Sequence, residues 1–218
     1  MMIGMHEEQA WARLEEERRS FADLLAGLDD AQWDTASLCE GWSVAEVATH
    51  ITAGPTGTLR EFAWAMVRAR GRFGQANRLM VANRMHRPRS AIVADARAHA
   101  DDRFSPPGMG WRAQVTDFLL HRLDVNVPLG LDAPPAHDLW TGALTFLCGP
   151  RATRGFIDKG LPELTLVATD AEWAHGVGPR VEGPLEALAL AVSRRPTPRL
   201  AELAGPGSDT LRRWALRG

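Results

Sequence analysis

The sequence predicts a mainly helical protein, with a helical domain over residues 1–158 followed by a small α+β domain over residues 159–218. Up to about residue 158, apolar residues recur at spacings of three and four, which is the period of a helix with one buried face. From residue 163 the pattern changes, because "ELTLVATD" alternates apolar and polar residues as a half-buried strand does.

Composition narrows the class of protein. The chain has 218 residues, 45% of them hydrophobic, which is enough to bury a substantial core. The formal net charge is -2 and no block of like charge stands out, so we expect neither nucleic acid nor an anionic membrane as a partner. The chain has no apolar run of membrane-spanning length and no signal-peptide core, so we expect a cytoplasmic protein. Of the 25 basic residues 24 are arginine, which indicates a GC-rich bacterial genome.

The helical region divides at turn residues. Ser43 is a candidate N-cap, and Glu46 stands three residues later in capping-box register. The helix that starts near Ser43 is expected to be interrupted by the turn sequence at 53–55. A long helix is expected to start at Trp111 and to end before Pro128 and Gly130. The other helices are predicted at about 6–28, 56–70, 74–86, 90–102 and 136–158.

The tail is predicted to combine strands and short helices. The first strand covers 163–170, and a turn with a short second strand covers 175–183. A helix follows with Pro184 at its first position, and two more short helices complete the chain.

One group of residues carries candidate chemistry. Asp117 and His121 are four residues apart, so they project from one face of a helix, and the residues between them are apolar. A buried carboxylate and imidazole are costly unless they are paired or bound to a metal. With His50 from a second helix they would make three ligands, which leaves coordination positions open for water or substrate.

Simpler interpretations of the same residues stay open. The Asp-x-x-x-His pair occurs often as a plain contact within a helix, and His50 could be a core histidine with no ligand role. Asp124 lies near the same face. It would either hydrogen-bond a ligand histidine or act as a helix cap or an ion-pair partner of Arg122 or Arg112.

Other catalytic classes lack their signatures. "GPTGT" at 54–58 has no lysine, so it is not a phosphate-binding P-loop. The chain has no Gly-x-Ser-x-Gly nucleophile elbow and no tyrosine, which argues against a serine hydrolase and excludes phenolic acid catalysis.

Two motifs and the tail resemble one known family. "SLCEGWSVAEVATHI" at 37–51 and "QVTDFLLHRLDVNVPLG" at 114–130 resemble the signatures of the DinB-like, mycothiol-dependent maleylpyruvate isomerase family. The tail from Leu164 onward resembles the small C-terminal domain of the same family, so the resemblance runs from about residue 7 to the end.

The resemblance implies a four-helix bundle that binds a divalent metal, usually zinc with nickel as the alternative, followed by the small C-terminal domain. His50, Asp117 and His121 would be the ligands. The characterised isomerase has glutamate where this sequence has Asp117, so the site here would be tighter or hold a different ion. Cys39 is either a small buried hydrophobe or a fourth ligand.

The resemblance also implies an activity. Mycothiol, the low-molecular-weight thiol of actinobacteria, would be activated for addition to a small electrophile, in an isomerase or an S-transferase. Arg180 of the small domain would contact the acidic cosubstrate or be an ordinary solvated arginine. A non-catalytic metal-containing binding protein and a thiol-independent metal hydrolase are the alternatives. Members of the family are often homodimers.

Overall fold

The computed structural model describes residues 5–56, 58–103, 105, 108–132, 136–157 and 160–216. Their contacts divide the chain into two compact units. The bundle unit comprises Glu7–Phe104 and His121–Ala133, and the sheet unit comprises Met1–His6, Ser105–Leu120 and Pro134–Gly218. The domain boundary at residue 158 follows the change of pattern along the sequence and stays a prediction. None of the described helices is both long and apolar enough to cross a membrane.

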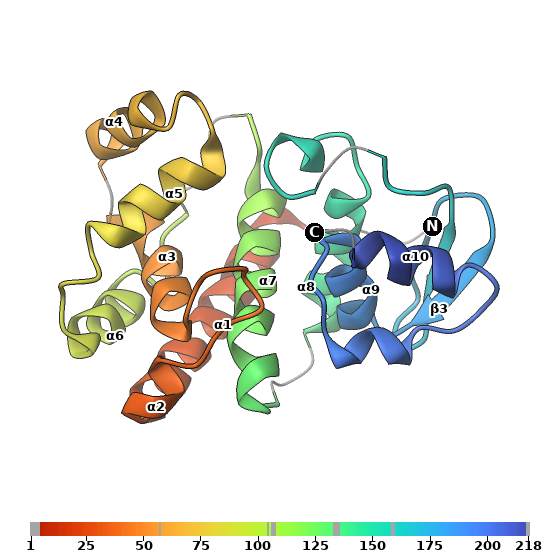
Figure 1. Ribbon diagram of the computed structural model, residues 1–218, viewed down its shortest axis with the longest axis horizontal. Coiled ribbons are helices and arrows are strands. Elements are labelled where there is room, and N and C mark those ends of the chain that lie inside the picture. Colours follow the sequence, from red (N-terminus) through yellow and green to blue (C-terminus); the bar gives the residue numbers. More distant parts are fainter. Residues whose placement is uncertain are drawn as a thin grey trace. The chain divides into compact units, whose positions relative to one another are not determined.

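Four helices form the frame of the bundle unit, and each of them meets two of the others (Figure 1). Helix α6 packs against both α1 and α3. Helix α7 completes the ring, because its His121 meets His50 of α3 and its Arg122 pairs with Glu17 of α1. The bounds are α1 (Glu7–Gly27), α3 (Val44–Thr56), α6 (Arg89–Ala98) and α7 (Trp111–Leu129), of which the bundle unit includes the part from His121.

Two further helices lie side by side in the bundle unit and form the α4–α5 arm, residues 58–84 (Figure 1). Helix α4 (Leu59–Arg68) begins with a capping box between Thr58 and Glu61. The Thr58 N–H hydrogen bond lowers the pKa of Glu61 below its ordinary value. Helix α5 (Phe73–Ala82) packs against α4 through small residues and also against α3. A short helix in the loop before α3, α2 (Asp30–Trp33), was not predicted from the sequence.

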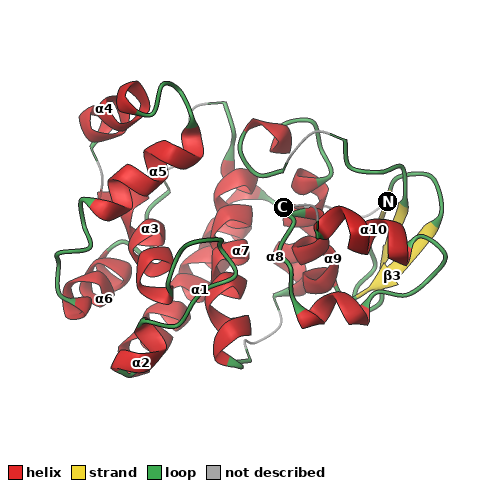
Figure 2. Ribbon diagram, viewed as in Figure 1, coloured by secondary structure: helices red, strands yellow, loops and turns green. Residues whose placement is uncertain are grey.

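The strands gather in the sheet unit (Figure 2). Strand β1 is the middle strand; it is antiparallel to β2 and parallel to β3, with Leu166 opposite Val181. Every residue of helix α9 except Glu186 is buried, as its apolar composition requires. The elements are α8 (His137–Leu147), η1 (Ala152–Arg154), β1 (Thr165–Ala168), β2 (Ala174–His175), β3 (Arg180–Gly183), α9 (Leu185–Val192), η2 (Pro198–Glu202) and α10 (Ser208–Ala215).

The mainly helical class with a small sheet is confirmed, but several predicted helix ends were wrong, three of them at segments that contain proline. The helices predicted to end near residues 86 and 102 end at Ala82 and Ala98. Helix α3 continues through 53–55 to Thr56, because a proline in the last turn removes a single backbone donor. Helix α7 likewise includes Pro128 and ends at Leu129, before Gly130 with φ 64°. Helix α8 ends at Leu147 and not near residue 158, since "GP" follows its C-cap.

The ion pair between Glu17 and Arg122 yields a prediction, because both side chains are buried. Glu17→Gln removes the charged partner of Arg122 in this buried pair, so we expect the free energy of unfolding to fall by about 3–5 kcal/mol. Glu15→Gln is the matched control on the same helix, since Glu15 makes an exposed pair with Arg19. Urea denaturation measures both variants, and equal losses would contradict a structural role for the buried pair.

Candidate metal centre

The N-terminus of α3 is fixed by its capping box. The Ser43 N–H donates to Glu46 Oε2 at 2.8 Å, and the Glu46 N–H donates to Ser43 Oγ at 3.3 Å. The turn before it depends on Gly41, whose φ of 73° suits glycine. The helix therefore begins directly after Trp42 and carries His50 about two turns further on.

The His50 ring lies between two other rings. Its centroid is 4.7 Å from the His121 ring at an interplanar angle of 82°, and 5.3 Å from the Trp42 ring at 64°. Trp42 is buried, so it removes one side of His50 from water. The pairing of His50 with His121, predicted from two separate motifs, is thus present within the bundle unit.

The orientation of His121 is set by Asp124, one turn later on α7. Asp124 is fully buried, and its Oδ2 lies 2.8 Å from His121 Nδ1. An ionised carboxylate only accepts hydrogen bonds, so with Asp124 ionised the donor in this contact is Nδ1–H of His121. In the neutral imidazole the lone pair is then on Nε2. Of the contacts considered for Asp124 in the sequence, the one with the candidate ligand histidine is formed.

Asp117 lies one turn before His121 on the same uninterrupted helix, so the helix itself sets where the two stand relative to each other. One ligand atom from each of His50, Asp117 and His121 lies within 4.8 Å of the other two. Two imidazoles and a carboxylate are a donor set that suits zinc or nickel. The three side chains predicted as ligands can therefore hold one divalent cation.

A second group shares His121 and adds Cys39 and Asp124, again with ligand atoms within 4.8 Å of one another. A cation held by this group would compete with the hydrogen bond between His121 and Asp124, because that bond occupies Nδ1. Metal-bound histidines usually donate their other ring N–H to a carboxylate, which is the arrangement here when the ion sits with His50 and Asp117. We therefore favour the first group.

The loop at 37–42 is attached to α7 by its backbone. The Leu38 N–H donates to the carbonyl oxygen of Asp124 at 3.1 Å. That oxygen would ordinarily accept from the N–H four residues later, but position 128 is a proline and has none. Pro128 thus leaves the Asp124 carbonyl available, and the loop that carries Cys39 and Trp42 is held against the helix.

Arg180, considered in the sequence, and Cys148 both lie in the sheet unit and belong to neither group. Arg180 is exposed on β3 and pairs with Glu182 of the same strand, and its contact with a cosubstrate stays a prediction. Burial raises the pKa of the Cys148 thiol to about 12, so Cys148 is not a nucleophile at neutral pH.

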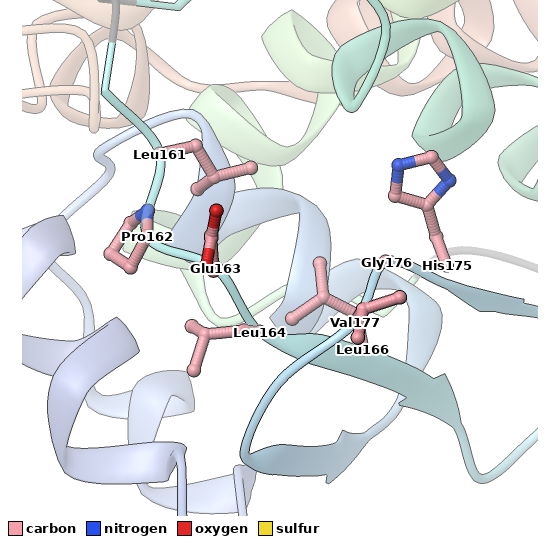
Figure 3. A pocket seen from close by; sticks show the side chains of 8 residues that line it. All are labelled: Leu161, Pro162, Glu163, Leu164, Leu166, His175, Gly176 and Val177. Atoms are coloured by element: carbon pink, nitrogen blue, oxygen red, sulfur yellow. The ribbon is translucent and has the colours of Figure 1, made fainter.

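The sheet unit has a hollow of about 400 Å³ beside β1 and β2 (Figure 3). Glu163 and His175 are its titratable side chains, and the remaining lining is mostly apolar. None of the residues of the two metal groups lines it. Its residues are Leu161, Pro162, Glu163, Leu164, Leu166, His175, Gly176 and Val177.

Comparison with known proteins agrees with the resemblance seen in the sequence. Residues 14–105 match the family described as the mycothiol maleylpyruvate isomerase N-terminal domain, which includes His50 and the loop before it. The resemblance is confirmed over that range. No curated protein matches this chain significantly.

Two solved structures share the fold. One is the mycothiol-dependent maleylpyruvate isomerase, at 15% identity, and the other is a histidine-to-alanine mutant of the mycothiol-dependent maleylpyruvate isomerase, at 14% identity. Each superimposes with a TM-score of 0.62, over 95% of this chain and 97% of the other.

Asp124→Asn tests the support of His121. Asparagine keeps the shape of the side chain but removes the charge that fixes the Nδ1 proton, so we expect zinc affinity to fall about 10–100-fold. Competition with a chromophoric chelator measures the dissociation constant, and Asp132→Asn in the exposed segment after α7 is the control. An unchanged zinc affinity with intact circular dichroism would show that Asp124 has no influence on the metal.

Cobalt substitution separates the two ligand groups. We expect the Co²⁺-loaded protein to lack strong thiolate-to-cobalt charge-transfer absorption in the near ultraviolet, because Cys39 lies outside the favoured group. Cys39→Ser should leave the spectrum and the zinc content unchanged, whereas His50→Ala should reduce the zinc content. A charge-transfer band that disappears in Cys39→Ser would assign the ion to the group with Cys39 and Asp124.

Proposed function

We propose that this chain, whose residues 14–105 belong to the mycothiol maleylpyruvate isomerase N-terminal domain family, is a metal-dependent and mycothiol-dependent enzyme. Its reaction would be the addition of the mycothiol sulfur to a small electrophile, in an isomerase or an S-transferase. The observation that carries the proposal is the group of His50, Asp117 and His121, with His121 oriented by a buried carboxylate. Zinc is the expected ion and nickel the alternative.

The ion, when bound, would lower the pKa of a coordinated thiol and so favour the thiolate at neutral pH. The protein's own residues provide the setting for that chemistry. His50 and His121 offer neutral nitrogen donors, and Asp124 keeps the Nδ1 proton of His121 in place. Trp42 limits the access of water to His50.

By the resemblance stated from the sequence, Asp117 distinguishes this chain from the characterised isomerase, which has glutamate at that position. The aspartate is one methylene shorter, yet a carboxylate oxygen still lies within 4.8 Å of a ring nitrogen of each histidine. Its negative charge partly offsets the charge of a divalent cation, which reduces the cost of holding that cation in a partly buried site. The change does not remove a ligand and is therefore compatible with a retained metal.

The experiment uses the untagged protein purified without chelator. Elemental analysis measures the metal, and the conversion of maleylpyruvate is followed with and without mycothiol. We expect about one zinc or nickel per chain and turnover that requires mycothiol. His50→Ala and His121→Ala should lose both metal and turnover, and Asp117→Asn should weaken metal binding about 10–100-fold. His86→Ala is the control, because His86 is exposed on the turn after α5.

The alternative functions correspond to distinct results. Metal that is retained while no thiol-dependent conversion occurs would indicate a binding protein. Turnover that needs the metal but not mycothiol would indicate a hydrolase. Full metal content in all three ligand variants would show that the proposed site is wrong.

A further inference from the structure

Arg78 reaches from α5 to the loop before α3. Its Nη2 donates to the Glu40 carbonyl oxygen at 3.0 Å, and its guanidinium carbon lies 6.0 Å from the Trp42 ring centroid. Gly41 makes room for it, since a Cβ at that position would stand 3.3 Å from Arg78 Nη1. The Arg78 side chain therefore lies against three successive residues of the loop.

This arginine stands close to the candidate metal centre. The Trp42 ring that it covers is in turn 5.3 Å from the His50 ring. Two ring contacts thus connect the Arg78 guanidinium to a predicted metal ligand, all within the bundle unit. The electrostatic influence of a positive charge extends over such a distance.

The guanidinium has donors to spare for an anion. A guanidinium carries five N–H groups in a planar fork that matches a carboxylate, and the hydrogen bond described for Arg78 uses one nitrogen. The side chain is exposed, so the remaining donors can meet a solute. A lysine would offer the charge without the fork.

The surroundings favour a negatively charged solute. Between Thr58 and Arg84 the chain has one acidic residue, Glu61, and its carboxylate pairs with Arg84. The other arginines of the α4–α5 arm are exposed, and no described ion pair neutralises them. They are Arg60, Arg68, Arg70, Arg72 and Arg78. An excess of one sign attracts ions of the opposite sign to that face.

We infer that Arg78 is a specificity-determining residue, which binds the carboxylate of an anionic electrophile beside the His50 end of the metal centre. The inference rests on the proposed function for the identity of the reaction. It adds the residue that selects an electrophile bearing a carboxylate. Neutral electrophiles of the same shape would lack this contact.

The test compares two probes that share a cis double bond but differ in charge: maleate, a dianion, and its neutral dimethyl ester. Calorimetry measures both dissociation constants on the zinc-loaded full-length protein without thiol. We expect Arg78→Met to weaken maleate binding about 10–100-fold, as the loss of a charge-assisted pair does. The ester should bind the variant as it binds the wild type, and Arg78→Lys should restore part of the maleate affinity.

Arg72→Met is the matched control, because Arg72 is an exposed arginine at the N-cap of α5 with no side-chain capping bond. It should leave both affinities unchanged. Wild-type protein that binds no maleate, or an Arg78→Met variant that keeps full maleate affinity, would overturn the inference. Equal losses for maleate and ester would overturn it too, because they would show that Arg78 only supports the loop.

These measurements need no turnover, so they are independent of the enzymatic proposal. If mycothiol supports no conversion of either probe or of maleylpyruvate while the maleate affinity depends on Arg78, the enzymatic proposal fails and the anion site stands. If conversion occurs but Arg78→Met keeps the wild-type preference for maleate, only the anion site fails.

Discussion

The backbone hydrogen bond from Leu38 to Asp124 is the constraint on which the candidate metal centre depends. It forms at a carbonyl that α7 cannot use itself, because Pro128 has no N–H to donate. Asp124 therefore acts twice: its main chain holds the loop at 37–42, and its side chain holds His121. Because one residue sets both, the loop that leads into α3 and the imidazole on α7 are placed relative to each other before any ion binds.

The burial of Asp124 requires that its charge be compensated. A fully buried carboxylate is costly unless its charge is used, and here it accepts a hydrogen bond from an imidazole. A divalent cation on the opposite nitrogen of that imidazole would make the acidic N–H a stronger donor to the carboxylate. The metal and Asp124 would then stabilise each other through the ring of His121. The hydrogen-bonded pair satisfies the carboxylate without an ion, and it is also the support that metal-bound histidines usually have.

Local signals in the sequence were sufficient for much of the fold and for the candidate ligands. The capping box of Ser43 and Glu46 fixed the start of α3, and the spacing of Asp117 and His121 fixed their common face. The contacts of Leu38 with Asp124 and of Arg78 with Glu40 could not be foreseen, because they join residues far apart in the chain and each ends on a backbone carbonyl that has no side-chain signature. Proline in the last turn does not end α7, because it removes only one backbone donor. At position 128 the missing donor leaves the Asp124 carbonyl oxygen to accept a hydrogen bond from the loop instead.

The two ring nitrogens of His121 determine which of the two ligand groups is favoured for the ion. Nδ1 faces the buried carboxylate, so an ion on Nε2 adds to an existing hydrogen bond, whereas an ion with Cys39 and Asp124 would have to replace it. The first arrangement leaves the Cys39 sulfur outside the coordination of the ion. It also leaves the cation with three protein ligands, so that an external thiol has a coordination position to occupy. A centre completed by Cys39 would fill that position with the protein's own sulfur and compete with the cosubstrate. The chemistry proposed for this chain therefore requires the ion to sit with His50 and Asp117.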